Sequence, residues 1–250
     1  MRAIHSATVR IIILLFLILA SSVNTFASKS NGLPIANNFS AVYRLESGLF
    51  TIGETRRSLT TLKNGLHVFE SYTRPTGMLS VFYNGDVTER SLWKYENHMA
   101  VPVEYSYIDT NEKNKRDAVL KFDWDKLTVT NDINGDPWQL QIRQGTQDKL
   151  LYQVSIMMDL ATDNKRKELN YLVADGGKLR KYDAKILREE KIRTPAGNFD
   201  TVRVVREDKK SITTLWCAPS LSYLPVRIEH YKKKPNTRVN AYLTKVTGLN

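Results

Sequence analysis

The sequence predicts an all-β protein with one main helix, in which an antiparallel meander forms a strongly curved open sheet or half-barrel and the helix packs in its mouth. Apolar and polar residues alternate through most of the chain, which is the period of half-buried strands. Turn sequences rich in Gly, Asn and Asp separate the alternating segments. A single stretch, near residues 150–161, has helical spacing instead.

The first predicted strand covers 39–45, where Phe39, Ala41, Tyr43 and Leu45 share one face. A second segment places Ala118, Leu120, Phe122 and Trp124 on one face, and the alternation continues through 127–133. The remaining strands are predicted near 66–72, 79–83, 103–108, 137–142, 169–174, 179–187, 199–206, 211–217, 224–231 and 239–246.

Tight turns are predicted where residues that tolerate positive φ cluster between strands. These turns are Lys63-Asn64-Gly65, Tyr83-Asn84-Gly85-Asp86, Asn134-Gly135-Asp136, Asp175-Gly176-Gly177 and Pro195-Ala196-Gly197-Asn198. Short turns join antiparallel neighbours, so the order of the strands in the sheet should follow the chain. Both an open and a closed barrel are compatible with this alternation.

The predicted helix follows Asp148, a favourable N-cap residue. Its stripe consists of Leu150, Leu151, Val154, Met157, Met158 and Ala161. Ile156 and Leu160 lie off that stripe, so the helix is apolar around much of its circumference and should be covered by the sheet.

The first 27 residues read as a secretory signal peptide. Arg2 and Arg10 precede an apolar run from Ile11 to Ala20, and the small residue Ala27 ends the segment Thr25-Phe26-Ala27, where cleavage is expected. The run is too short to cross a bilayer, and we expect no transmembrane span in the mature protein. The chain is therefore predicted to be a periplasmic protein, cleaved near Ala27, with one antiparallel β domain at 28–250.

The chain is strongly basic. Its formal charge is +11, and it remains +9 when Arg2 and Arg10 leave with the leader. The cations cluster in segments that we expect to be turns, such as 113–116, 178–181 and 232–234. Such clusters solvate loops or attract polyanions, which outside the cytoplasm means anionic lipid headgroups, lipopolysaccharide or acidic polysaccharide. No basic helix with interleaved aromatic residues indicates nucleic-acid binding.

Motifs of reactive or metal-binding residues are not found in the sequence. Cys217 is alone, so no disulfide within the chain is available, and its apolar segment predicts a buried, inert thiol. His67, His98 and His230 have no metal-ligand spacing, and we predict no metal and no cofactor. No nucleophile elbow is present, which favours a protein that is not an enzyme.

Several segments in order resemble an exported bacterial family called domain of unknown function 3108. They are Phe39-Ser40-Ala41-Val42-Tyr43-Arg44, Ile52-Gly53-Glu54, Pro75-Thr76-Gly77, Glu89-Arg90-Ser91, Phe122-Asp123-Trp124, Gly145 to Asp148, Thr194 to Phe199, and Leu215 to Pro219 with Leu224 to Ile228. The resemblance implies a periplasmic, mostly antiparallel β protein, and it brings no established activity. The implied architecture is similar to the curved sheets of periplasmic lipoprotein carriers, which wrap a helix over an apolar cavity; this step is an analogy of fold.

The leading functional hypothesis is a non-enzymatic periplasmic protein that binds an apolar or lipid-like envelope ligand in the concave face of the sheet. The residues expected to line that cavity are Trp124, Trp138, Leu151, Val154 and Met158, with Arg143 at an anionic headgroup. A second hypothesis is an envelope scaffold or assembly factor that binds protein or polysaccharide at its rim, and a filled core would favour it. The third is a glycan hydrolase with Glu89 or Asp123 as general acid or base.

Overall fold

The computed structural model describes residues 32–77, 80, 84–111 and 115–249, with the side chain of residue 188 left out. The predicted signal peptide and most of the predicted strand at 79–83 lie outside these residues, and residue 80 is not in a strand. The described residues from Leu33 onward form one compact unit, which spans Leu33–Asn250.

The elements bounded within the described residues of this unit are fifteen strands, one α-helix and one short 3-10 helix. The first eight strands are β1 (Phe39–Ser47), β2 (Phe50–Thr61), β3 (His67–Pro75), β4 (Val87–Glu96), β5 (Met99–Asp109), β6 (Arg116–Asp123), β7 (Thr128–Ile133) and β8 (Asp136–Gln141). The others are β9 (Gln147–Asp148), β10 (Glu168–Asp175), β11 (Lys178–Thr194), β12 (Gly197–Glu207), β13 (Ser211–Ala218), β14 (Leu224–Lys232) and β15 (Thr237–Thr247). Helix α2 covers Tyr152–Thr162, and η1 covers Pro219–Leu221.

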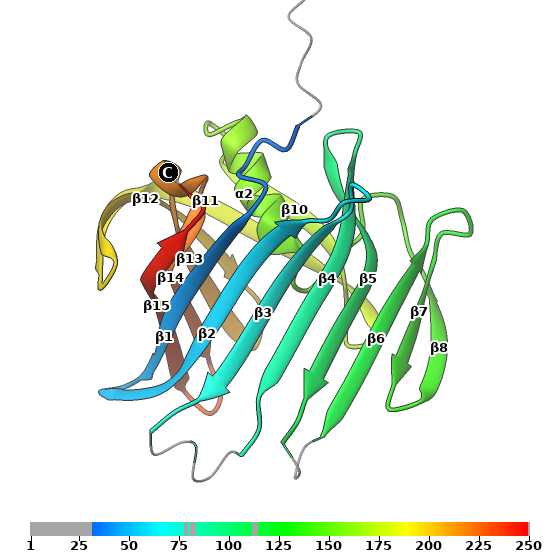
Figure 1. Cartoon of the computed structure of the whole chain (residues 1–250), viewed down its shortest axis with the longest axis horizontal. Helices are drawn as coiled ribbons and strands as arrows, with labels where there is room; N and C mark the ends of the chain where they lie inside the picture. The colour runs from blue at the N-terminus through cyan, green and yellow to red at the C-terminus, as the bar shows by residue number, and fades with distance from the viewer. Residues whose placement is uncertain (1–31, 78–79, 81–83, 112–114, 250) are drawn as a thin grey trace, which may run out of the picture. The chain divides into compact units, whose positions relative to one another are not determined.

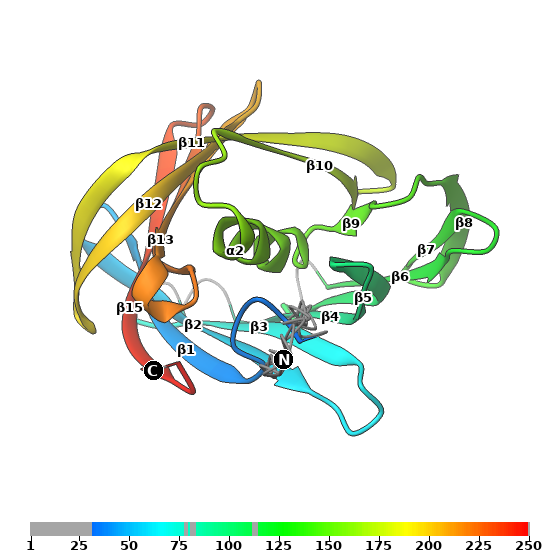
Figure 2. The same ribbon diagram turned by 90° about the horizontal axis from the view of Figure 1, so that it is seen from above.

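All strands of the unit belong to one sheet, in the order β8-β7-β6-β5-β4-β3-β2-β1-β15-β14-β13-β12-β11-β10-β9. Every pair is antiparallel except β9–β10, which is parallel. The sheet curves strongly and remains open, with β8 and β9 at its two edges (Figures 1 and 2). The predicted fold class is confirmed, and of the two alternatives left by the alternation the structure has the open one.

Strand β2 was not predicted from the sequence, although it lies next to the first predicted strand and pairs with β1 and β3 along its length. Its buried positions are Gly53, Thr55 and Leu59, and only one of these is a large apolar residue. The hydrophobic alternation is therefore too weak to identify the strand. Backbone hydrogen bonds to β1 on one side and β3 on the other hold this segment as a strand.

Helix α2 lies inside the curve of the sheet (Figure 2). It starts at Tyr152, later than the stripe suggested, because residues 149–151 form a turn. Asp148 does not cap the helix itself. Its Oδ1 instead accepts hydrogen bonds from the backbone N–H groups of Leu150 (2.8 Å) and Leu151 (2.7 Å), which orders the turn that leads into α2.

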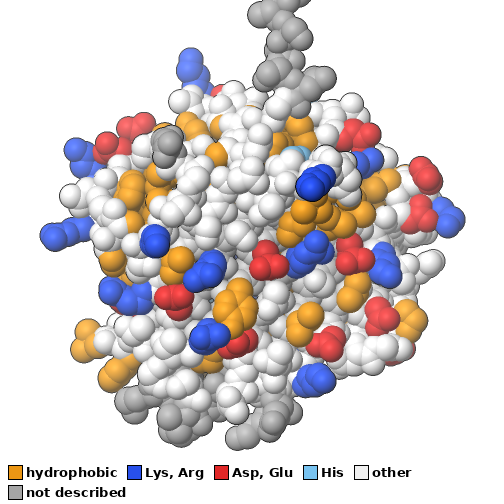
Figure 3. Space-filling model, viewed as in Figure 1, with side chains coloured by type: hydrophobic (Ala, Val, Ile, Leu, Met, Phe, Trp, Pro, Cys, Tyr) orange, Lys and Arg blue, Asp and Glu red, His pale blue; other side chains and the backbone are white. Residues whose placement is uncertain are grey.

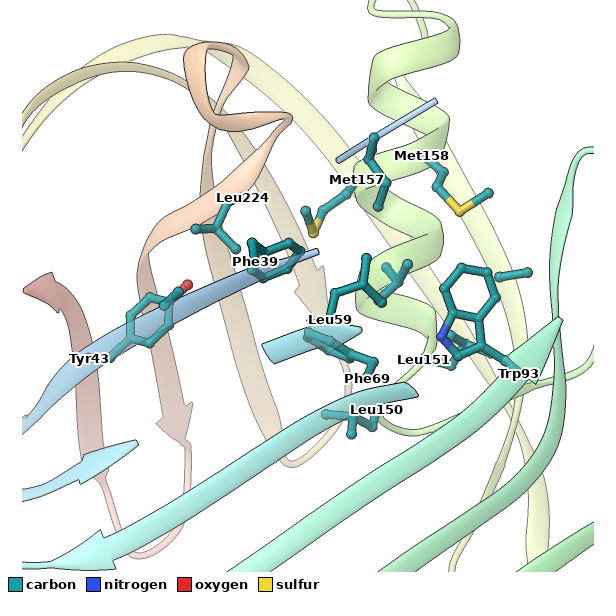
Figure 4. Close-up of a cluster of buried hydrophobic side chains, with 14 of the residues drawn as sticks. Phe39, Tyr43, Leu59, Phe69, Trp93, Leu150, Leu151, Met157, Met158 and Leu224 are labelled. Carbon is teal, nitrogen blue, oxygen red and sulfur yellow. The ribbon is translucent and has the colours of Figure 1, made fainter. Parts of the chain in front are cut away.

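The helix fills the concave side of the sheet by packing in two directions. Leu150, Leu151, Val154 and Met157 lie against side chains of β1 to β4 and β14, such as Phe39, Leu59 and Trp93 (Figure 4). In the other direction, Tyr152, Ile156 and Leu160 contact the apolar face of β10 to β13, which includes Val173, Val204 and Cys217. The sheet surrounds the helix, and this explains why its apolar residues are not confined to one stripe.

One prediction about a single side chain, the burial of Cys217, is confirmed. Cys217 is completely buried, and burial raises the pKa of its thiol. His98 lies in the exposed turn between β4 and β5. His67 packs its ring over Trp93, with 4.5 Å between ring centroids, and burial lowers its pKa.

Candidate ligand site at the seam of the sheet

The two ends of the sheet approach each other without a ladder of backbone hydrogen bonds. The edge strand β9 lies inside the curve, against β4 and β5, while β6 to β8 continue past it (Figure 2). Side chains make this junction. Gln147 Nε2 donates to the carbonyl oxygen of Ala100 (2.8 Å), and Ser91 Oγ donates to Asp148 Oδ2 (2.6 Å). We call this junction the seam.

A third contact joins the outer strand β8 to the other end of the sheet. The indole ring of Trp138 lies on Gly177 in the β10–β11 turn, so close that a Cβ atom at Gly177 would be 2.6 Å from the ring atom Cζ2. Gly177 also has a φ of +73°, which favours glycine. Strand β8 thus contacts the β10–β11 turn at a residue that has no side chain.

A cavity of about 180 Å³ lies at the seam, which we call the seam cavity. Its lining combines residues of β5, β6 and β7 with one residue after β9, two at the end of β10 and one in the turn after β10. They are Tyr105, Tyr107, Arg116, Ala118, Leu120, Asn131, Ile133, Lys149, Ala174, Asp175 and Gly176. One part of the wall is therefore apolar, and another presents two phenols, an amide, two cations and the carboxylate of Asp175, which is paired with Arg180.

The charged part of the wall includes Lys149, which pairs with Glu89. Lys149 Nζ lies 2.9 Å from Glu89 Oε1 and 4.5 Å from the ring centroid of Tyr107. The hydroxyl of Tyr105 donates to the same oxygen of Glu89 at 2.7 Å. Burial, and then the charge of Glu89, raise the pKa of Tyr105, and burial raises that of Tyr107. Both phenols remain protonated at neutral pH.

Within the described residues, two polar residues of the seam cavity wall, Asn131 and Arg116, have no side-chain hydrogen-bond or ion-pair partner. Asn131 is only 3% exposed, and no hydrogen bond of its side-chain amide is found within the described residues. Arg116 is exposed and takes part in none of the ion pairs found in the same residues. Buried polar groups are normally hydrogen-bonded, so the amide favours an occupant that can satisfy it, whether water or ligand.

Behind this wall lies a completely buried carboxyl group. Asp148 accepts hydrogen bonds from Ser91 and from two backbone N–H groups. Burial raises the pKa of Asp148 to about 6, against the lowering effect of these hydrogen bonds. The group connects β4 with the turn before α2, so its role in this arrangement is to hold the helix and the seam together.

The six residues predicted to bind a ligand are not brought together in one cavity of the described unit. Leu151 and Val154 are completely buried in the core, and Trp138 lies at the seam against Gly177. Arg143 is exposed in the segment between β8 and β9. The indole of Trp124 stacks on Phe122 with centroids 5.8 Å apart, and its Nε1 donates to the carbonyl oxygen of Pro102 at 2.8 Å.

Met158, the sixth of these residues, lines a second cavity of about 380 Å³ beside α2. Other residues of that wall are His98, Gln147, Asp159 and Tyr171. That any of the six binds a ligand stays a prediction. None of them lines the seam cavity.

The two carboxylates of the hydrolase hypothesis lie at different places. Glu89 is on β4, engaged by Tyr105 and Lys149. Asp123 ends β6 and is bound by Lys126, whose Nζ is 3.0 Å from Oδ2. Hydrogen bonds from Lys126 lower the pKa of Asp123. The carboxyl group beside Glu89 is Asp148, a residue to which the sequence analysis assigned only a capping role.

Sequence reasoning missed Tyr105, Tyr107, Arg116 and Lys149. The alternation does place the two tyrosines on one face of a strand. What it cannot indicate is that residues 174–176 return beside that face, because this depends on how far the sheet curls.

The fold and the site define a class of protein: an open, strongly curved antiparallel sheet that encloses one helix and leaves a small mixed cavity where its ends approach. The chain belongs to the family described as "Protein of unknown function (DUF3108)", which it matches over residues 41–244. This confirms the resemblance found in the sequence. No curated protein matches the chain.

A similar solved structure is that of a β-barrel-like protein of the domain of unknown function DUF1849 from Brucella abortus. It has a TM-score of 0.58 and 8% identity, over 86% of this chain and 98% of that one. At this identity the likeness concerns the fold alone. A protein of Parabacteroides distasonis with the provisional description of a lipoprotein has a TM-score of 0.34 and 12% identity, over 86% and 98% of the two chains. In the described residues, α2 and η1 are both too short for a membrane crossing.

Proposed function

We propose that the chain is an exported, non-enzymatic binding protein of the cell envelope, and that its ligand is an anionic amphipathic molecule of lipid type held at the seam. The observation that carries the proposal is the composition of the seam cavity. Arg116 and the amide of Asn131 suit an anionic, hydrogen-bonding headgroup, and Leu120, Ile133 and Ala174 suit the apolar part next to it.

The size of the seam cavity limits what it can hold. Its volume of about 180 Å³ is the share of roughly six water molecules in the liquid. It is smaller than the roughly 300 Å³ at which most small-molecule pockets begin. The headgroup and the first carbons of a chain fit this space, whereas a whole acyl chain needs more room.

Additional room would come from widening of the seam. The concave face is filled by α2, so a long chain in that face would have to displace core side chains. The seam, by contrast, is joined by side-chain contacts such as Gln147 with Ala100 and Trp138 on Gly177. Separating it would break no β-ladder, which makes it the less costly route for a ligand.

The location in the envelope rests on the predicted leader. Arg2, Arg10 and the apolar run that follows are typical of export to the periplasm. The charge of +9 that remains after cleavage would favour anionic ligands in that compartment.

The second candidate function is an envelope scaffold or assembly factor that binds a protein or an acidic polysaccharide at its rim. The observation that favours it is the filled concave face, with seven buried residues on α2. In that case the seam cavity holds water.

Native mass spectrometry and lipid extraction of protein purified without detergent from the envelope of its own bacterium test the proposal. We expect a reproducible bound mass that Arg116→Glu and Ile133→Trp remove, because the first reverses a cation and the second fills the seam cavity. Arg143→Glu is the matched control, since Arg143 is an exposed arginine outside this cavity. Circular dichroism checks that each variant is folded.

Clean protein without a bound mass, and without binding to added anionic lipid, would overturn the proposal and favour the scaffold. A bound mass that is lost with Arg143→Glu and kept with Arg116→Glu would also contradict it. That result would place the headgroup where the sequence analysis expected it.

A further inference from the structure

The most exposed apolar side chains of the described residues lie at one hairpin tip. Leu49 is 99% exposed and Phe50 is 66% exposed. Gly48, with a φ of +59°, begins the two-residue turn between β1 and β2 and so directs Leu49 away from the sheet. We call Leu49 and Phe50 the apolar tip. Apolar groups that project from a surface in this way have no role in the core of the domain.

The apolar tip lies at the same edge of the sheet as three basic turns. In an antiparallel meander alternate turns share an edge, and β1 pairs with β15. The β14–β15, β12–β13 and β10–β11 turns therefore lie at the same strand ends as the β1–β2 turn, and we call this side of the sheet the lower edge. A contact fixes the nearest of them: Ser47 Oγ donates to the carbonyl oxygen of Arg238, at the start of β15.

Six exposed lysines occupy these turns and the adjoining strand ends: Lys178, Lys181, Lys209, Lys210, Lys232 and Lys234. The carboxylates beside the β12–β13 turn are engaged by other cations. Glu207 pairs with Lys233 at 2.6 Å, and Asp208 with Arg206 at 3.6 Å. None of the ion pairs of the described residues includes any of the six lysines. Their charge is therefore available to a partner.

Figure 3 shows hydrophobic side chains that protrude near the place of the β1–β2 turn in Figure 1, with Lys and Arg side chains on the same face of the molecule. An apolar wedge beside a cluster of lysines is the combination used by proteins that lie on anionic bilayers. The wedge enters the acyl boundary while the lysines remain at the headgroups. A soluble polyanion such as an acidic polysaccharide would use the lysines and offer no apolar phase for Leu49 and Phe50.

We propose that this lower edge docks on an anionic lipid membrane, with Leu49 and Phe50 inserted at the interface and the six lysines on the headgroups. The inference goes beyond ligand binding at the seam and does not depend on it. Docking by a short wedge together with a basic patch is reversible, and screening of the lysines makes it weaker at high salt.

Vesicle flotation with the full mature chain tests the docking. We expect binding to phosphatidylcholine vesicles that contain phosphatidylglycerol, little binding to pure phosphatidylcholine, and release by salt. Lys209→Gln together with Lys210→Gln should lower the partition coefficient about 25-fold, since each lysine near an anionic surface contributes about fivefold. Phe50→Asp should lower it at least tenfold, roughly the loss expected when a buried apolar side chain is removed.

Matched controls come from the opposite edge. Met99→Asp alters an exposed apolar residue, 44% exposed, in the strand that follows the β4–β5 turn. Lys165→Gln with Lys167→Gln removes the same charge between α2 and β10. Both controls should bind as the wild type does, and so should the seam variant Ile133→Trp, which separates this test from that of the seam ligand.

Three results would overturn the proposal. One is absence of flotation with anionic vesicles at low salt. Another is equal loss in the control variants, which would indicate attraction by net charge alone. The third is unchanged binding of Phe50→Asp when the lysine variant is impaired, because the edge would then be a polyanion site without insertion.

Discussion

The indole ring of Trp138, on the outer strand β8, rests on the backbone of Gly177 in the turn between β10 and β11. These residues belong to opposite ends of the sheet order, and their contact is one of the few that joins those ends. The open sheet is held at its seam by such side-chain contacts, so single substitutions there should change the stability and the width of the seam separately from the core.

Gly177→Ala should lower the free energy of unfolding by more than Gly176→Ala. Both glycines have positive φ, and holding an L-residue in that region costs about 1–2 kcal/mol. At Gly177 the added methyl group also meets the ring of Trp138 at 2.6 Å, whereas at Gly176 the first neighbour is at 4.0 Å. Urea denaturation of the two variants measures the difference. Equal losses would show that the ring moves aside without cost.

Asp148 should make the protein more stable as pH falls from 7 toward 4, relative to Asp148→Asn. Burial raises the pKa of Asp148 from 3.8 to about 6, so the folded state takes up a proton before the unfolded state does. The stabilisation is fully present below the unfolded value and is lost as pH rises through about 6. Its size is up to about 3 kcal/mol.

Urea denaturation of the wild type and of Asp148→Asn at several pH values tests this, because all other titrating groups are common to both proteins. A stability of the wild type relative to Asp148→Asn that is independent of pH, or that decreases as the pH falls, would contradict the raised pKa.

Leu151→Ala should destabilise the protein by about 2–5 kcal/mol, because Leu151 is completely buried in the core and its loss leaves a cavity. The same variant also tests its predicted role in ligand binding. A residue that lines a ligand cavity would lose the ligand with little change in the stability of the ligand-free chain. Thermal or urea unfolding of delipidated protein distinguishes the two, and a loss below about 1 kcal/mol would contradict the core assignment.

Cys217 should be unreactive toward thiol reagents in the native protein and should react when the chain unfolds. Its side chain is completely buried, and burial raises the pKa of the thiol, so little thiolate forms at neutral pH. Labelling with a thiol-specific chromogenic reagent, with and without urea, measures this. Rapid modification without denaturant would show that β13 opens to solvent in the native state.

Much of the fold could be predicted from the sequence because the signals are local. The alternation at 39–45 and 239–246, and turns such as Asn134-Gly135, depend on neighbouring residues only, and the strands and turns follow there. Strand β2 was not predicted because Gly53 and Thr55 occupy buried positions where the pattern needs large apolar residues. The candidate site could not be predicted at all, since Tyr105 and Ala174 lie 69 positions apart along the chain and share a cavity only after the sheet has curled.

The sequence by itself therefore determined an antiparallel meander with one helix, and it carries the predicted export signal and the basic turns. Tertiary structure decided that α2 packs in two directions, that the sheet stays open, and that Lys149, Glu89 and the two tyrosines meet at the seam. The physical reason is range: backbone dihedral preferences and hydrophobic period act over a few residues, whereas the approach of β9 to β5 depends on the summed twist of the whole sheet and on the volume of the helix inside it.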